Sequence, residues 1–291
     1  MAKVTKAVIP CAGYGTRFLP ATKTIAKELF PIIETPSIHY IVEECVKSGI
    51  TDVLIITSRR KKSLDDYFDR DVELEDILKK ENKTKFLDAI TYPNQMCKIT
   101  YVRQQEMKGT GNAVMLAETF AAGEPFAVLF GDDLMYTEGK PVTKQLIDAY
   151  ENTGLTIVGC QSVPQSEVSK YGIIKPGMVK GRYCEIKGMV EKPSPEEAPS
   201  RLASLGRYVL SPDIFDYIRQ TKPMANGEIG LPHAILNQAA KVGALAYDFE
   251  GRRYDIGDKF GYLSASIDFG LKNPETSDKL KAYIKELAEK I

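Results

Sequence analysis

Short apolar runs alternate with an amphipathic segment at the start of the chain. Residues 7–10 form a short apolar stretch, and residues 52–57 have a continuous apolar core at 53–56; both have the composition of buried parallel strands. Between them, apolar side chains recur three, four, seven and eight positions after Ile38, which is the spacing of one helix face, and Gly49 follows as a stop signal. The pattern predicts a strand–helix–strand unit whose two strands run parallel.

The same alternation continues to residue 130. Residues 58–85 are densely charged, and their apolar positions predict helices with one buried stripe and a solvated charged face. That stripe consists of Leu64, Phe68, Leu74, Ile77 and Leu78. Residues 99–102 and 126–130 indicate two further strands, with a helix at 111–120 between them. A doubly wound α/β sheet is the simplest architecture for this order.

The second half of the chain has more strands and fewer long helices, which is typical of a mixed α and β region. Its predicted strands are residues 155–163, 172–175, 183–191 and 207–210. Residues 277–291 form an amphipathic helix with Leu280, Tyr283, Ile284 and Leu287 on one face. This helix either packs on its own domain or pairs with a partner chain.

Composition narrows the functional classes. The 291 residues, of which 43% are hydrophobic, can bury a large core without disulfide bonds. The five cysteines are scattered and lack a C-x-x-C spacing, so we expect reduced thiols rather than a zinc site. With 39 basic and 39 acidic side chains there is no global positive field for binding nucleic acid. Since no apolar run could cross a bilayer, we expect a cytoplasmic protein without a membrane partner.

The segment after the first strand is suited to binding a polyphosphate. Gly13 and Gly15 allow close approach of the backbone to an anion, while Arg17, Lys23 and Lys27 offer positive charge. The alternative is an ordinary strand-to-helix turn followed by a solvated basic face. The segment lacks the third glycine of a dinucleotide-binding loop, and the chain contains no P-loop motif, which disfavours ATPases of that class.

Two aspartates are candidates for binding a metal. Asp132 follows the predicted strand 126–130 after Gly131, next to Asp133, and Asp255 lies in another strand-like segment followed by glycine. Parallel strands end at one edge of a sheet, so Asp132 is expected to lie near the glycine loop. Mg2+ prefers one or two carboxylates together with phosphate oxygens and water. The alternative is that these aspartates cap a following helix or turn.

A series of spaced motifs resembles one family. In chain order the motifs are G-Y-G-T-R-F-L-P-A-T-K, K-E-L-F-P-I, R-Q-x-E with G-T-G-N-A-V, F-G-D-D-L, S-K-Y-G-I-I, V-E-K-P-S-P and R-Y-D-I-G-D-K-F-G-Y. They extend from residue 6 to residue 274 and therefore cover nearly the whole chain. This order resembles the bacterial UTP:glucose-1-phosphate uridylyltransferases, within the sugar-phosphate nucleotidylyltransferase family.

The resemblance implies a Rossmann-like α/β fold with a mixed, mainly parallel central sheet, helices on both faces and a smaller α+β sugar-side region. It implies one nucleotidyltransferase domain over residues 1–291. Within it, residues 1–150 would form the nucleotide-binding half, residues 151–274 the sugar-binding half and residues 275–291 the C-terminal helix. It also implies Mg2+ dependence and a homodimer or homotetramer.

The resemblance further assigns roles to residues. Ala12, Gly13 and Gly15 would contact the nucleotide, with Gln104 and Gly109 completing the base pocket. Arg17 and Lys27 would bind the phosphates of UTP, and Asp132 and Asp255 would hold Mg2+. Gly172 and Glu191 would contact glucose, and Lys192 the phosphate of glucose 1-phosphate. For Glu191 and Lys192 the alternative is a surface ion pair that contributes almost nothing.

The implied reaction needs no protein nucleophile, because an anionic phosphate oxygen of glucose 1-phosphate can attack UTP and expel pyrophosphate to leave UDP-glucose. His39 and His233 lie in no catalytic pattern and are expected to be structural. Departures from the family at Ala26, Lys108, Asn112 and residues 230–233 leave open another sugar phosphate or dTTP as substrate. A non-catalytic regulator that binds UDP-sugars is the alternative from a different class.

Overall fold

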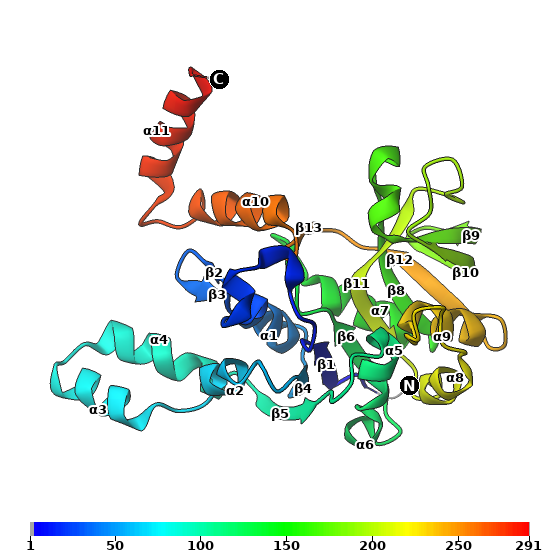
Figure 1. Ribbon diagram of the computed structural model, residues 1–291, viewed down its shortest axis with the longest axis horizontal. Coiled ribbons are helices and arrows are strands. Elements are labelled where there is room, and N and C mark those ends of the chain that lie inside the picture. The colour runs from blue at the N-terminus through cyan, green and yellow to red at the C-terminus, as the bar shows by residue number, and fades with distance from the viewer. Residues whose placement is uncertain (1–2, 291) are drawn as a thin grey trace.

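One nine-stranded sheet extends through the computed structural model, which describes residues 3–290 (Figure 1). Its first part consists, in spatial order, of β5 (Lys98–Arg103), β4 (Asp52–Thr57), β1 (Lys6–Pro10) and β6 (Phe126–Leu129). It continues with β11 (Leu202–Leu210), β8 (Thr156–Ser162), β12 (Ala244–Asp248), β10 (Tyr183–Glu191) and β9 (Gly172–Lys180). The two halves of the chain therefore share a single sheet.

The sheet is mixed and mainly parallel. Pairs β1–β4, β1–β6, β4–β5 and β8–β12 are parallel. Strand β11 is antiparallel to β6 and β8, and β10 is antiparallel to β12 and β9. Only β10 and β11 thus run against the common direction of this sheet. The predicted fold class is confirmed.

Helices cover both faces of the sheet because side chains of each strand alternate between two cores. In β1, Ala7 and Ile9 pack into one core and Val8 into the other. The first core is covered by α1 (Ser37–Lys47), α2 (Ser63–Phe68) and α7 (Val142–Thr153). The second is covered by α5 (Gly109–Met115), α8 (Ile214–Gln220) and α9 (Leu231–Ala239).

The prediction of one helix at residues 111–120 was wrong. Its residues belong to α5 and to the separate short helix α6 (Glu118–Ala121). Leu116 and Ala117 between them adopt φ values of −66° and −87° with ψ near zero, so the chain turns without continuing the α-helical ladder. Ala117 is buried at this turn, so packing against the second core stabilises the break.

The prediction of helices with one buried stripe in the charged segment 58–85 is only partly correct. It contains α2 and α3 (Val72–Lys80), and a further helix, α4 (Thr84–Gln95), follows it without having been predicted. Helices α3 and α4 lie together at one end of the molecule, away from most of the sheet (Figure 1). Leu74 and Ile77 are therefore 38% and 44% exposed, which corrects their assignment to a buried stripe.

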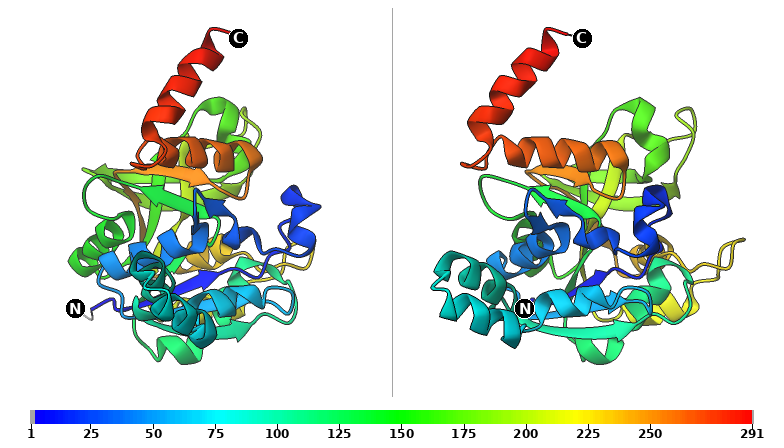
Figure 2. Two further views of the ribbon diagram at one scale, coloured as in Figure 1. Left: turned by 90° about the vertical axis from the view of Figure 1, so that its left-hand side faces the viewer. Right: turned by 60° about the vertical axis from the view of Figure 1, so that its left-hand side comes forward.

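Two small sheets and a C-terminal extension complete the fold. Strand β7 (Asp133–Tyr136) pairs with β13 (Arg252–Asp255), and β2 (Pro31–Ile32) pairs with β3 (Thr35–Pro36). Helix α10 (Lys259–Gly270) packs on them. Helix α11 (Ser277–Ala288) projects from the body and contains no buried residue, and Leu280 near its start lies against Gly270 at the end of α10 (Figure 2).

Two further predictions concern the state of the cysteines and membrane-spanning helices. All five cysteines are free thiols, as predicted. Within residues 3–290, no helix combines the length and the apolar character needed to span a bilayer.

Candidate active site

The loop after β1 exposes its backbone at its centre. Ala12 is buried, whereas Gly13 is exposed and a Cβ there would have no atom within 4 Å. Gly15 has a φ of 65°, in the left-handed region that favours glycine. Three 3-10 turns follow, at Thr16–Phe18, Ala21–Lys23 and Lys27–Leu29. The loop is therefore open to a ligand at Gly13, and no α-helix begins directly after it.

The two predicted metal ligands, Asp132 and Asp255, meet beside Gly257. The Ile256 N–H donates to the carbonyl oxygen of Asp132 at 2.9 Å, which joins the ends of β6 and β13. A Cβ on Gly257 would lie 2.7 Å from Asp132 Oδ2 and 3.1 Å from Asp255 Oδ1. Glycine is therefore required at 257, because a side chain would fill the small space that both carboxylates face.

The predicted phosphate-binding cations lie on the same two aspartates. Lys27 Nζ forms an ion pair with Asp132 Oδ2, and Arg17 Nη1 lies 3.8 Å from Asp255 Oδ2. Arg17 also donates to the carbonyl oxygen of Gly257 at 3.1 Å. Burial would raise the pKa of Asp132, but the charge of Lys27 holds it below its ordinary value. The structure thus brings two carboxylates and two cations together at the carboxyl end of the sheet.

The donor set fits Mg2+ bound together with a substrate. Within residues 3–290, no group of three or more histidine, cysteine and acidic side chains is arranged to hold a metal ion. Asp132 and Asp255 supply two hard carboxylates, so the remaining ligands of a metal here would be phosphate oxygens and water. That combination is the usual coordination of Mg2+ in phosphate-transfer sites.

Asp133 has a different environment from its neighbour Asp132. It begins β7, is buried, and forms an ion pair with Arg253. Gly206 lies so close that a Cβ there would overlap the Asp133 carboxylate. Burial raises the pKa of Asp133 to about 6. Asp133 therefore belongs to the internal packing of the sheet rather than to the open space near Gly257.

The predicted base-pocket residues are joined by hydrogen bonds. Gln104 is buried after β5, and its Nε2 donates to Asn112 Oδ1 at 2.9 Å and to the Gly109 carbonyl oxygen at 3.4 Å. Gly109 has a φ of 90°, and a Cβ there would lie 2.6 Å from the carbonyl oxygen of Ile229. The Ile229 N–H in turn donates to the Lys108 carbonyl oxygen at 2.8 Å. The departures at residues 108, 112 and 230–233 thus lie in one contact region.

The predicted sugar-side residues come from the β9–β10 pair. Gly172 is opposite Glu191 in the antiparallel register, and a Cβ on Gly172 would lie 3.0 Å from Glu191 Oε2. Lys192 has a φ of 47°, and its N–H donates to the Tyr171 carbonyl oxygen at 2.9 Å. Glu191 and Lys192 are exposed and, in the part of the chain described, form no ion pair with each other. The surface-pair alternative is therefore not what the structure shows.

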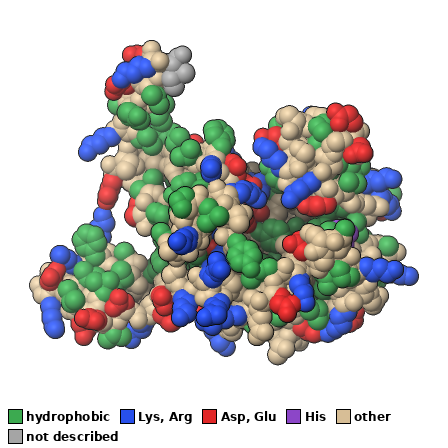
Figure 3. Space-filling view, in the orientation of Figure 1, with side chains coloured by type: hydrophobic (Ala, Val, Ile, Leu, Met, Phe, Trp, Pro, Cys, Tyr) green, Lys and Arg blue, Asp and Glu red, His purple; other side chains and the backbone are tan. Residues whose placement is uncertain are grey.

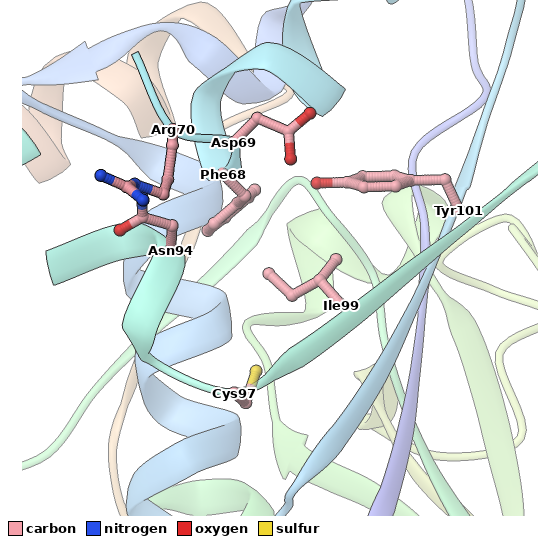
Figure 4. A pocket seen from close by; sticks show the side chains of 7 residues that line it. All are labelled: Phe68, Asp69, Arg70, Asn94, Cys97, Ile99 and Tyr101. Atoms are coloured by element: carbon pink, nitrogen blue, oxygen red, sulfur yellow. The ribbon is translucent and has the colours of Figure 1, made fainter. Parts of the chain in front are cut away.

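The surface between these two groups of residues is hollowed. Figure 3 shows a depression between the N-terminal loops and the lobe that carries β9 and β10, with charged side chains of both signs around it. Two other hollows, of about 260 and 630 Å³, contain none of the predicted site residues. Figure 4 shows the smaller one, where the Asp69 carboxylate and the Tyr101 hydroxyl point toward each other.

A buried ion pair that was not predicted from the sequence lies next to Cys11, at the start of the glycine loop. Lys61 Nζ lies 2.7 Å from both carboxylate oxygens of Glu28, and both side chains are buried. Burial, followed by the charge of Glu28, raises the pKa of the neighbouring Cys11 thiol. The predicted solvated face of residues 58–85 is thus wrong at Lys61. Nothing in the local pattern distinguishes Lys61 from Lys62. The one sequence feature that could have indicated this ion pair was Glu28, which belongs to the K-E-L-F-P motif.

The histidines lie among aromatic and backbone neighbours rather than at the aspartates. His39 Nδ1 is 2.9 Å from the Tyr67 hydroxyl, and burial lowers the pKa of His39. His233 lies in the first turn of α9, close to Gly230. Both positions agree with the structural role expected from the sequence.

Comparison with known proteins identifies the family. A family model described as "Nucleotidyl transferase" matches residues 6–270. A UTP–glucose-1-phosphate uridylyltransferase of Staphylococcus epidermidis is 47% identical over 287 residues, which are 99% of each chain. The chain belongs to the nucleotidyl transferases, in the UTP–glucose-1-phosphate uridylyltransferase family. The resemblance drawn from the spaced motifs is confirmed.

Solved structures support the same assignment. The chain is similar to a UDP-glucose pyrophosphorylase complexed with UDP-glucose, with a TM-score of 0.84 and 43% identity over 93% of this chain and 100% of the other. It is also similar to a UTP-bound UGPase from Acinetobacter baumannii, with a TM-score of 0.91 and 35% identity over 98% and 99% of the two chains. The fold of this family therefore extends across almost all of the present chain.

Proposed function

We propose that the protein transfers a uridylyl group from UTP to glucose 1-phosphate and releases pyrophosphate, with Mg2+ as cofactor. The observation that supports this most strongly is the convergence of Asp132, Asp255, Arg17 and Lys27 at the end of the sheet, where a Cβ on Gly15 of the glycine loop would lie 3.6 Å from Lys27 Cβ. Two carboxylates for a metal and two cations for phosphate oxygens are what a nucleoside triphosphate requires. The full-length relatives named for this activity support the same proposal.

We assign one substrate to each of the two groups of residues. Ala12, Gly13 and Gly15 would contact the nucleotide, and Gln104 with the Gly109 turn would bind the base. Gly172 and Glu191 would contact the glucose hydroxyls, while Lys192 would meet the sugar phosphate. A Cβ at Gly172 would crowd Glu191, so glycine there leaves the carboxylate free to accept hydrogen bonds from a sugar.

The reaction proceeds by direct displacement at the α-phosphorus of UTP. A phosphate oxygen of glucose 1-phosphate forms the new O–P bond, and the bond to pyrophosphate breaks on the opposite side. Mg2+, held by Asp132 and Asp255, would offset charge on the phosphate oxygens. Arg17, Lys27 and Lys192 reduce repulsion between the two anionic reactants and align them. No proton has to be removed from the attacking oxygen, so no general base is needed.

Release of pyrophosphate tests this function. Purified protein is incubated with UTP and glucose 1-phosphate, with Mg2+ or with excess chelator. We expect release that depends on both substrates and on Mg2+. Parallel reactions with dTTP and with other hexose 1-phosphates separate the specificity alternative. Absence of release with every pair, despite binding of UDP-glucose, would support the non-catalytic binder instead.

We also propose a homodimer or homotetramer. The C-terminal helix leaves Tyr283 and Leu287 exposed at 58% and 41%, and it contains no buried residue. An exposed apolar stripe of this kind usually marks an interaction surface. Light scattering of the full chain measures the assembled mass, and a monomeric mass at micromolar concentration would contradict the prediction.

A further inference from the structure

Arg253 links the metal side of the site to the sugar side. It lies in β13, two residues before Asp255, and its side chain is only 13% exposed. On one side, its Nη2 forms an ion pair with Asp133 and lies 3.6 Å from Asp255 Oδ2. The guanidinium thus stands beside one of the proposed metal ligands without being one of the predicted substrate contacts.

On its other side, Arg253 contacts Tyr171. The guanidinium carbon lies 5.1 Å from the centre of the Tyr171 ring, and Nη1 donates to the Tyr171 hydroxyl at 3.3 Å. Tyr171 directly precedes Gly172, and its carbonyl oxygen accepts the Lys192 N–H. The Arg253 side chain therefore extends from the strand that carries Asp255 to the side chain of Tyr171, whose own backbone is hydrogen-bonded to Lys192.

The anchor of Arg253 at Asp133 is held firmly by the core. The carbonyl oxygen of Asp133 accepts a hydrogen bond from Arg207 Nη2 at 2.7 Å. Arg207 is fully buried and also pairs with Glu44 of α1 at 2.7 Å. The Gly206 backbone closes the other side of Asp133. The Asp133 end of this contact is thus enclosed by the core of the sheet, whereas the Tyr171 end is not.

An ion pair with Asp133 does not by itself explain why residue 253 is an arginine. The Arg253 Nε is buried and has no hydrogen-bond partner. A buried donor without a partner destabilises the folded state. A lysine could neutralise Asp133 without this unpaired donor, but it lacks the planar group that stacks on the Tyr171 ring. The contact that requires an arginine is therefore the stacking on Tyr171, on the sugar side, rather than the ion pair with Asp133.

We propose that Arg253 is a positioning residue that holds the Tyr171–Lys192 backbone at the correct distance from Asp255, and so determines how well the sugar phosphate is bound. This inference rests on the proposed function. The expected signature is selective: weaker binding of the sugar-containing ligand, with little change for UTP. A role in stability alone would lower the melting temperature and reduce the active fraction for both ligands equally.

Arg253→Lys tests the proposal, with Arg252→Lys as the matched control. Arg252 is adjacent on β13, but its side chain is 62% exposed and pairs with Asp268 instead. We expect Arg253→Lys to raise KM for glucose 1-phosphate about tenfold, as expected from a small misplacement. The KM for UTP should change less than threefold, and Arg252→Lys should resemble the wild type in both values.

Variants of Tyr171 test the same contact from the other side. Tyr171→Phe keeps the ring and should shift KM for glucose 1-phosphate less than threefold, whereas Tyr171→Ala should reproduce the tenfold increase. The double variant Arg253→Lys with Tyr171→Ala should be no worse than either single variant, because both remove one contact. Additive increases in KM for glucose 1-phosphate would overturn the proposal. If Arg253→Lys does not fold, Tyr171→Ala still tests the same contact.

Calorimetric titrations separate this inference from the proposed function, because they do not require turnover. UDP-glucose should bind Arg253→Lys about tenfold more weakly than the wild type, while UTP binding stays within threefold. Equal changes for both ligands, or no change, would contradict the role of Arg253. A wild-type protein that binds both ligands but releases no pyrophosphate would contradict only the proposed catalytic activity.

Discussion

The metal side and the sugar side of the site differ in how their charges are paired. Lys27 and Arg17 already lie near the carboxylates of Asp132 and Asp255. Glu191 and Lys192, on the sugar side, are exposed and make no ion pair with each other. The charges on the proposed metal side are thus paired within the protein, whereas Glu191 and Lys192 on the proposed sugar side are not paired with each other. Substitutions on the first side should affect folding and activity, and those on the second should affect activity alone.

The largest effect that would sharpen this comparison is expected for Lys192→Ala. Lys192 would offset the charge of the sugar phosphate, so its loss should lower kcat/KM by on the order of a hundredfold. The melting temperature should stay within about one degree, because no internal partner is left unpaired. Steady-state pyrophosphate release and thermal unfolding measure the two quantities. Lys187→Ala, on the same hairpin, is the control, and equal kinetics for both variants would exclude this role of Lys192.

A comparable loss, on the order of a hundredfold, is expected for Arg17→Ala on the metal side. The guanidinium lies beside Asp255 and Gly257, where it would align the phosphates of UTP. Lys62→Ala, at an exposed lysine outside the predicted site, should stay near wild-type activity. Pyrophosphate release at saturating glucose 1-phosphate reports the difference, and unchanged turnover in Arg17→Ala would place the triphosphate elsewhere.

A smaller effect is expected for Asp255→Asn. Removing one of two carboxylates should raise the Mg2+ concentration required for half-maximal activity about tenfold, with partial recovery at high Mg2+. Asp258→Asn is a useful control, because Asp258 caps α10 by accepting from the Phe260 and Gly261 N–H groups. A Mg2+ titration that is identical for wild type and Asp255→Asn would remove Asp255 from the metal site.

The smallest effect, on stability, is expected for Lys27→Met. The substitution leaves the Asp132 carboxylate without its ion-pair partner in a partly buried place. We expect the free energy of unfolding to fall by about 1–2 kcal/mol, measured by urea denaturation. Lys192→Met should leave it unchanged. Equal stability of the two variants would contradict the view that charges are paired within the protein on only one of the two sides.

Local pattern sufficed to predict most of the elements and to single out the candidate site residues. The strand at residues 52–57 and the α1 face were correct because the period of apolar positions depends only on nearby residues. The glycine loop and its cations were recognisable because their chemistry is contiguous in the chain. The roles assigned to Asp132, Asp255 and Lys192 stay predictions until the variants are measured.

Tertiary packing decided what local pattern could not. Asp132 and Asp133 are adjacent and chemically identical, yet the turn from β6 into β7 leaves Asp132 near Gly257 and buries Asp133 against Gly206. Likewise, Lys61 is buried only because Glu28 from a distant loop neutralises it. The sequence alone determined which residue types were present and their local order. Which charges became partners depended on how the strands met in space, since ion pairing acts between residues far apart in the chain.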